Sequence, residues 1–352
     1  MSPATAPPPR RDGVRLLAVD ARTGRHRDHP FTALPELLEP GDLLVLNDAA
    51  TLPASLAGHA PDGSTVELRL AGPNEGQGRF TGVLHGAGDW RLRTEDRPAP
   101  PRLPVGAELT FDGLRARILE RLSTSSRLYR VELVPSRGSL LAALYRAARP
   151  VQYSYLTRPL DLWSVQTRFA GRPWSVEMPS AGRPLTWRAL LSLRARAIGL
   201  TQVTHAAGLS STGDAVLDAA LPLAERYEVG ADAAESIVRA RSRGGRVIAM
   251  GTTVARAVEG AALCAGGVLA ASRGTTDLIL DASLSPRWID GIVTGVHSPG
   301  ESHFELLAAF APRAVLEDAV EHARSAGYLN HEFGDAMLIA PGLDRTERSR
   351  AA

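Results

Sequence analysis

The sequence contains no lysine, so all 40 of its basic side chains are arginines. Two explanations fit this absence: a bias of composition toward arginine, or a surface that binds RNA or phosphate, because the guanidinium pairs with two phosphate oxygens at once. The 40 arginines face 38 acidic residues, which leaves a formal net charge of +2. So small an excess does not by itself favour a nucleic-acid partner.

Cysteine is nearly absent as well. Cys264 is the only one, which excludes a disulfide within the chain and any metal cluster built on several thiolates. We therefore expect a reducing, cytoplasmic location. No apolar run approaches the roughly 18 residues of a membrane-spanning helix. The opening MSPATAPPPRRDG also lacks the apolar core of a secretion signal, so we expect no membrane association.

Several common catalytic signatures are missing too. The chain has no G-x-S-x-G nucleophile turn, no G-x-x-x-x-G-K-[ST] phosphate loop, no G-x-G-x-x-G dinucleotide turn and no C-x-x-C pair. Function must therefore be sought in less familiar patterns.

The pattern of apolar residues changes along the chain. Between about residues 56 and 136, short alternating segments such as STVELRL, WRLRT and RLYRVEL are separated by Gly, Pro and Asp, which favours a small antiparallel barrel. The flanking regions alternate buried strands with amphipathic helices. We predict an α/β main domain formed by residues 12–55 and 137–345, with an inserted β-barrel domain at residues 56–136. Residues 1–11 and 346–352 are predicted to be disordered tails.

Two helices carry boundary signals. Thr186 is a candidate N-cap for a helix that ends at Gly199. Asp232 and Glu235, three residues apart, form a candidate capping box for the next long helix.

The segment GGRVIAMGTTVARAVEGAA, residues 244–262, has the pattern of a buried strand that turns through Gly251, Thr252 and Thr253 into a helix. Such a turn exposes backbone N–H groups at the positive end of a helix dipole, where a carboxylate, phosphate or ribose can bind. Arg256, one turn further on, adds charge. The alternative is a tight structural turn in which a threonine caps the helix.

Histidines and carboxylates follow other predicted strands. His297, Glu301 and His303 surround a Pro-Gly turn, which permits three interpretations: a metal site, a surface loop, or an acid–base role for His297. The spacing matches no strong metal motif. Open α/β sheets gather ligand-binding groups at strand ends, so polar residues near the predicted strand ends are candidate site residues. Each of them can instead be a cap or a turn residue. They are His205, Glu225, Tyr227, Asp277, Asp290 and Asp335.

Five segments occur together in a recognisable order: GDLLVLND, GGRVIAMGTTVARAVEGAA, GTTDLIL, IDGIVTGVHSP and FGDAMLI. Across nearly its whole length the chain resembles the S-adenosylmethionine:tRNA ribosyltransferase-isomerases of queuosine biosynthesis. The resemblance implies an α/β domain interrupted by a β-barrel. It also implies that S-adenosylmethionine, as a substrate, donates its ribosyl group to an aminomethyl-deazaguanine base of tRNA. Methionine and adenine are lost, and no metal is needed.

The resemblance also assigns residues. It places His297, His205, Glu225 and Asp335 at catalytic positions, without deciding which of them transfers protons. The substrate-binding positions that it implies are Asn47, Asp48, Gln166, Thr167, Gly182, Gly251, Thr252, Thr253, Arg256, Glu259 and Asp277.

Several loops depart from the family pattern. Arg183-Pro184 stands where the family has Leu-His, HAAGLSSTG replaces a glycine-rich loop, and residues 295–301 lack a family Asn and Lys. Three hypotheses therefore stay open. The chain is a divergent member with the family reaction, a paralogue that transfers from S-adenosylmethionine or a related nucleoside to a different, small-molecule acceptor, or a non-catalytic nucleoside- or RNA-binding protein. The sequence predicts no oligomeric state.

Overall fold

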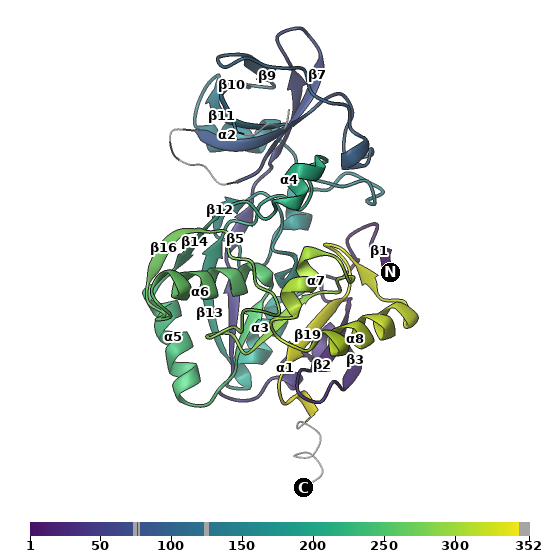
Figure 1. The fold of residues 1–352 in the computed structure, drawn as a ribbon, viewed down its shortest axis with the longest axis vertical. Coiled ribbons are helices and arrows are strands. Elements are labelled where there is room, and N and C mark those ends of the chain that lie inside the picture. Colours follow the sequence, from purple (N-terminus) through teal and green to yellow (C-terminus); the bar gives the residue numbers. More distant parts are fainter. Residues whose placement is uncertain (73–75, 77, 123–126, 345–352) are drawn as a thin grey trace.

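The computed structural model describes residues 1–72, 76, 78–122 and 127–344. It has two parts, a closed β-barrel and a larger α/β part built around one sheet (Figure 1). The chain leaves the α/β part after β5 (Ala49–Thr51), forms the barrel, and returns to the α/β part through α2 (Leu140–Ala147). The predicted fold class, an α/β main domain with an inserted antiparallel barrel, is confirmed.

The main sheet has nine strands in the order β16-β14-β13-β4-β15-β17-β19-β2-β3. Its central pairs β13–β4, β4–β15 and β15–β17 are parallel, whereas β14 and β19 run antiparallel to β13 and β17. Apolar residues fill β4 and β15, which are buried along their whole length, as expected for strands covered on both faces. The strand bounds are β2 (Arg15–Asp20), β3 (His26–Pro30), β4 (Leu43–Asn47), β13 (Gly199–His205), β14 (Glu225–Val229), β15 (Val247–Met250), β16 (Ser272–Thr276), β17 (Gly291–Gly295) and β19 (Ala336–Ala340).

Helices cover both faces of this sheet. One face packs against α5 (Ala231–Ser242), α6 (Thr252–Cys264), α7 (Ser302–Leu307) and α8 (Arg313–Ser325), and the other against α1 (Leu34–Leu37) and α3 (Trp187–Ala195). In β2, Leu17 and Val19 join the first core and Leu16 and Ala18 the second, because successive side chains of a strand point to opposite faces. The remaining short elements are β1 (Ser2–Pro3), β12 (Arg172–Ser175), β18 (Leu329–Asn330), α4 (Ala215–Ala219) and the 3-10 turns Phe31–Ala33, Thr94–Asp96, Leu162–Val165 and Ser180–Gly182.

The barrel closes in the order β10-β11-β8-β7-β6-β9. Alternation sets its inside and outside: in β10, Leu114, Ala116 and Ile118 are buried while Arg115 and Arg117 are exposed. Closure pairs every strand on both sides and so removes open sheet edges. The strand bounds are β6 (Ser55–His59), β7 (Thr65–Leu70), β8 (Arg79–His85), β9 (Glu108–Phe111), β10 (Leu114–Arg121) and β11 (Leu128–Pro135).

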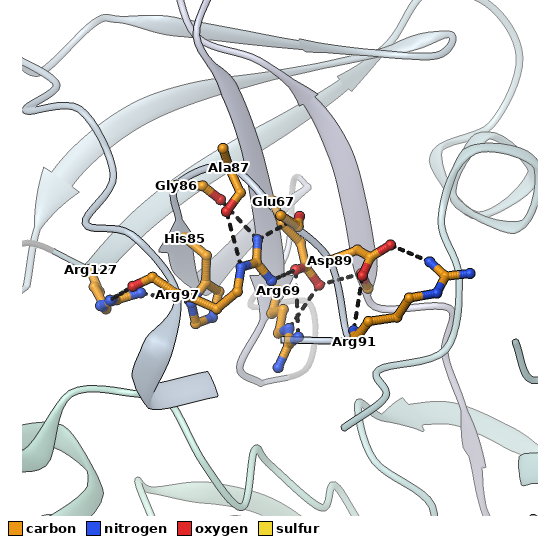
Figure 2. Close-up of polar contacts among 11 residues, drawn as sticks. Glu67, Arg69, His85, Gly86, Ala87, Asp89, Arg91, Arg97 and Arg127 are labelled. Carbon is orange, nitrogen blue, oxygen red and sulfur yellow. Dashed lines mark hydrogen bonds and ion pairs between the residues drawn. The ribbon is translucent and has the colours of Figure 1, made fainter. Parts of the chain in front are cut away.

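A buried polar network lies within the barrel part (Figure 2). The carboxylate of Glu67 accepts hydrogen bonds from Arg69 (Nε to Oε1, 2.8 Å) and from Arg97. Burial opposes the ionisation of Glu67, but ion pairing with Arg69 and the hydrogen bonds it accepts lower its pKa to about 2. Arg127 donates hydrogen bonds to Nδ1 of His85 (2.8 Å) and to the carbonyl oxygen of Arg97 (2.7 Å). The charges of Glu67, Arg69 and Arg97, which would be costly to bury alone, are thus paired.

The same network holds the loop that follows β8. Arg97 donates hydrogen bonds to the carbonyl oxygens of Gly86 and Gly88, each at 2.8 Å. This loop packs closely on the α/β part, because a Cβ at Gly213 would lie only 2.2 Å from the carbonyl oxygen of Thr94. The buried charges therefore help to fix the barrel against the segment that follows β13.

Two local predictions about chain segments are wrong. The tail predicted for residues 1–11 is tied down, since Ser2 and Pro3 pair with Leu329 and Asn330 of β18 and Ala4 is buried. The segment WRLRT forms turns and the start of a 3-10 helix rather than a strand. Residues 346–352 lie outside the described residues.

The helix boundaries divide similarly. The Thr186 side chain accepts a hydrogen bond from the Ala189 amide and caps α3, as predicted. The helix stops before Ala197, whose φ is +59°, and Gly199 begins β13, so the predicted stop at Gly199 is wrong. The N-cap of α5 is Gly230 and no side chain caps it, so the predicted capping box is also wrong.

Candidate functional site

Most of the predicted site residues lie along one edge of the main sheet, at the carboxyl ends of the parallel strands β4, β13, β15 and β17. The antiparallel strands β14 and β19 begin at this edge, because the ladders pair His205 with Tyr227 and Gly295 with Ala336. We call it the carboxyl edge. Segments far apart in the sequence meet there, as in other open α/β sheets that bind ligands.

The turn after β15 forms the centre of the carboxyl edge. Gly251 has φ +97° and ψ 159°, a conformation that only glycine adopts readily, and α6 begins at Thr252. No side chain caps this helix, so the predicted alternative of a threonine N-cap is wrong. Within the described part of the chain, the amides of Thr252 and Thr253 have no hydrogen-bond acceptor. The start of α6 is therefore free to bind an anionic or hydroxyl-rich group.

Asn47 holds this turn against β13. Its Nδ2 donates to the carbonyl oxygen of His205 (2.9 Å) and to Oγ1 of Thr253 (3.2 Å), while its Oδ1 accepts from the His205 amide (3.0 Å). Asp48 accepts a hydrogen bond from Thr204 Oγ1 (2.5 Å), and burial raises the pKa of its carboxyl group. Asn47 ends β4 and Asp48 follows it, and the Asn47 side chain joins the ends of β4 and β13. Their substrate-binding roles stay predictions.

A buried group of three ionisable side chains lies beside the turn. Arg256 on α6 ion-pairs with Glu225 and donates from Nε to the carbonyl oxygen of Leu278 (2.9 Å). Glu225 also accepts the Gly208 amide (2.6 Å). His205 is fully buried, and its Nε2 lies 3.5 Å from Oε2 of Glu225. Neither ring nitrogen has a hydrogen-bond partner among the residues that the structure describes. Burial, with the charge of Arg256, lowers the pKa of His205 to about 3, so the ring is neutral at pH 7.

A second histidine group follows β17. Nε2 of His297 hydrogen-bonds Oγ1 of Thr294 (3.1 Å), and its Nδ1 lies 3.5 Å from the Glu301 carboxylate. The rings of His297 and His303 stack with centroids 4.8 Å apart. Burial, with the neighbouring His297, lowers the pKa of His303 to about 4. Among residues 1–72, 76, 78–122 and 127–344, no group of three His, Cys, Asp or Glu side chains is arranged to hold a metal ion.

Two tyrosine–glutamate pairs border the same region, and the sequence reasoning missed them. The hydroxyl of Tyr153 donates to Glu177, which also accepts the amide of Ser210 (3.0 Å). The hydroxyl of Tyr155 donates to Glu332, and the two tyrosine rings stack at 6.1 Å. Burial raises the pKa of Glu177 to about 7. The short spacing of the two tyrosines in QYSYL was the only sequence signal.

These groups influence one another across the edge. Burial raises the pKa of Glu225, and the nearby charge of Glu177 adds to this shift while Arg256 opposes it. His331 stacks on Tyr155 (4.3 Å) and its pKa, lowered by burial, responds to the charges of Glu301 and His297. The arrangement therefore combines a free helix start, a neutral imidazole and a carboxyl group that titrates near neutrality, which suits binding and proton transfer.

The predicted residues of the 166–182 segment lie next to this region. Gln166 exchanges hydrogen bonds with the backbone of Thr51 (2.7 and 3.0 Å), which fastens its segment to β5. Thr167 is buried with its hydroxyl unpartnered among the described residues. Gly182 leaves room for its neighbours, because a Cβ there would lie 2.8 Å from the ring of Phe169.

Three predicted residues have other surroundings. Glu259 accepts the backbone amides of Arg287, Trp288 and Ile289, so its carboxylate holds that loop. Asp335 lies at the carboxyl edge, but its carboxylate accepts a hydrogen bond from the Arg15 amide (2.7 Å) and ion-pairs with the Arg15 side chain. Asp277 lies at the carboxyl edge just beyond β16, because Thr276 pairs with Glu225, but its side chain is exposed. Functional roles for these three stay predictions that no observed contact supports.

A two-sided α/β sheet with a barrel insertion, and ionisable side chains gathered beside a free helix start, define an α/β protein with a candidate ligand site at the carboxyl edge. The chain belongs to the family described as queuosine biosynthesis protein, whose model matches residues 2–339.

Individual relatives agree with this membership. A protein of Anaeromyxobacter sp. (strain K), named S-adenosylmethionine:tRNA ribosyltransferase-isomerase, is 38% identical to this chain over 345 residues. The match covers 96% of this chain and 95% of that protein. A protein of the same name from Gloeobacter violaceus is 36% identical over 346 residues, covering 96% of this chain and 92% of its own. The crystal structure of S-adenosylmethionine tRNA ribosyltransferase from Thermotoga maritima matches with a TM-score of 0.51 and 24% identity over 96% of both chains, which supports the fold.

Proposed function

We propose that this protein is an S-adenosylmethionine:tRNA ribosyltransferase-isomerase, the activity for which its curated relatives are named, with S-adenosylmethionine and tRNA as substrates. One observation carries the assignment of the reaction to the carboxyl edge: the free start of α6 adjoins the water-shielded group of His205, Glu225 and Arg256. No helix in the described part of the chain is long and apolar enough to cross a membrane. A cytoplasmic location and independence of metals stay predictions.

The proposed reaction needs a site for the methionine carboxylate or ribose, a base that removes a proton beside the sulfonium, and an acid that assists the departure of adenine. The amides at the start of α6 suit the first task. Glu177 suits a proton-transfer role, because a group with a pKa near 7 is populated in both forms at neutral pH. His205, neutral and with both ring nitrogens unengaged, suits a hydrogen bond to substrate.

A second function, transfer to a small-molecule acceptor, is favoured by the altered 183–186 loop. Arg183 and Pro184 stand where the family has Leu-His, and Arg183 is only 4% exposed. It donates to the carbonyl oxygen of Ser164 (3.0 Å) and lies 4.8 Å from the centre of the Phe333 ring. The family histidine is thus replaced by Pro184, and the leucine before it by a charged side chain that the protein holds in place. Such an exchange changes what the neighbouring site can accept.

The test is to incubate the purified protein with S-adenosylmethionine, with and without tRNA that carries the aminomethyl-deazaguanine base, and to measure released adenine and methionine. We expect release that depends on the modified tRNA. Binding of S-adenosylmethionine with adenine release that does not depend on tRNA would favour a different acceptor. Binding with no release under any of these conditions would favour the non-catalytic hypothesis, and no binding at all would contradict the proposal.

A further inference from the structure

Arginines surround an exposed tryptophan near the 3-10 turn Leu162–Val165. Trp163 is 62% exposed, and the guanidinium carbons of Arg11 and Arg168 lie 5.3 and 4.9 Å from its ring centre. Arg183 is near enough to both arginines for their charges to affect its pKa. We call Arg11, Arg168, Arg183 and Trp163 the Trp163 cluster. It brings together cations from three separate segments of the chain.

The cations of the cluster lack acidic partners. In the described part of the chain no carboxylate ion-pairs with Arg11, Arg168 or Arg183, and the charges that act on Arg183 are only those of the other two arginines. Burial and this repulsion lower the pKa of Arg183 to about 10. Arginines elsewhere differ: Arg188 and Arg10 both pair with Asp12. Like charges held together without a counter-charge are destabilising, and a bound anion removes that cost.

Backbone carbonyls hold the cluster in place. Arg11 donates to the carbonyl oxygen of Trp163 (2.6 Å) and to that of Gln166, and Arg183 donates to that of Ser164 (3.0 Å). Because the Arg11 guanidinium is already ordered, little side-chain entropy is lost when it binds phosphate oxygens. The exposed ring of Trp163 also suits stacking of an unpaired nucleobase.

The cluster adjoins the candidate site. Arg183 directly follows the 3-10 turn Ser180–Gly182, and a Cβ at Gly251 would lie 3.3 Å from that of Ala181 in this turn. Gln166 fastens the other side of the cluster to Thr51. Only the short turn Ser180–Gly182 therefore separates a polyanion bound at the cluster from the start of α6.

We propose that the Trp163 cluster is an RNA-binding surface: Arg11 and Arg168 take phosphates of a non-helical RNA segment, Arg183 adds positive charge from its buried position beside them, and one base stacks on Trp163. The inference rests on the proposed function in naming tRNA as the RNA. The new element is the location of the surface that binds this RNA.

The experiment measures tRNA affinity by fluorescence anisotropy over a range of salt concentrations. The variants are Arg168→Gln, the double variant Arg11→Gln/Arg168→Gln, and Trp163→Ala. The matched control is the double variant Arg22→Gln/Arg243→Gln, which also removes two positive charges, but from exposed positions away from the carboxyl edge. Thermal unfolding and S-adenosylmethionine titration are recorded for every variant, and Arg168→Gln serves if loss of the Arg11 contacts impairs folding.

We expect the double variant to bind tRNA at least about tenfold more weakly and to lower the slope of log affinity against log salt by roughly one to two. Trp163→Ala should weaken binding about 5- to 100-fold. The control should match the unmodified protein, and S-adenosylmethionine affinity should stay unchanged in all variants. Equal tRNA binding by cluster variants and control, or no tRNA binding by the unmodified protein, would overturn the inference. Cluster-dependent tRNA binding without adenine release would contradict the proposed reaction while leaving the RNA surface in place.

Discussion

Replacing Gly251 by alanine tests the turn at the centre of the carboxyl edge. The backbone there, with φ +97° and ψ 159°, costs an alanine about 1–3 kcal/mol. The added Cβ would also lie 3.3 Å from that of Ala181, so residues 180–182 must shift slightly. We expect the melting temperature to fall by roughly 2–4 °C for each kcal/mol lost. A displaced helix start should weaken S-adenosylmethionine binding about 10- to 100-fold, because a hydrogen bond to a charged group contributes about 1.5–3 kcal/mol.

Gly41→Ala is the matched control. Gly41 has a similar φ of +95°, no atom lies within 4 Å of the position of its Cβ, and it precedes β4 at the opposite edge of the sheet. Both variants should lose stability, but only Gly251→Ala should lose affinity in a calorimetric titration with S-adenosylmethionine. If Gly251→Ala binds as tightly as the unmodified protein, the start of α6 is not the binding site. An equal loss of affinity in both variants would show that general destabilisation is responsible.

Three further perturbations separate functional from structural roles. Glu225→Gln should lower the free energy of unfolding, measured by denaturant titration, by about 3 kcal/mol, because it leaves the buried charge of Arg256 without its ion-pair partner. A loss below about 1 kcal/mol would refute the importance of this ion pair. If Glu177 accepts a proton, turnover should rise with pH through about 7, because its raised pKa keeps the carboxyl group protonated below that pH. Glu177→Gln should abolish this rise, and an unchanged pH–rate profile in the variant would exclude the role. Glu259→Ala should reduce the melting temperature but not S-adenosylmethionine affinity, since its carboxylate binds only backbone amides of the described loop, and a selective loss of affinity would restore a substrate role.

Much of the arrangement at the carboxyl edge was predictable from the sequence. Apolar runs that end in polar residues mark strand ends, and parallel strands bring such ends to one edge, which is how Asn47, His205 and Gly251 meet. The glycine that precedes α6 also signalled a turn of unusual conformation.

Other features depend on partners that periodicity cannot reveal. Glu259 has the sequence context of a site residue, yet its carboxylate turns to a loop that begins 28 residues later. The pairing of Tyr153 with Glu177, and the raised pKa that results from burial of Glu177, arise only when the segments after α2 and β12 pack together. The ordered N-terminus likewise depends on contacts with residues 329–330 at the far end of the chain.

The most direct test of the central claim follows the ribosyl group itself. S-adenosylmethionine labelled in its ribose is incubated with the protein and tRNA bearing the aminomethyl-deazaguanine base, and label in the RNA and released adenine are both counted. The account predicts label in the tRNA in equal amount to adenine, and a reduction of both in the Gly251→Ala variant when S-adenosylmethionine is below saturation. Adenine release without label in the RNA, or no release by the unmodified protein, would contradict it.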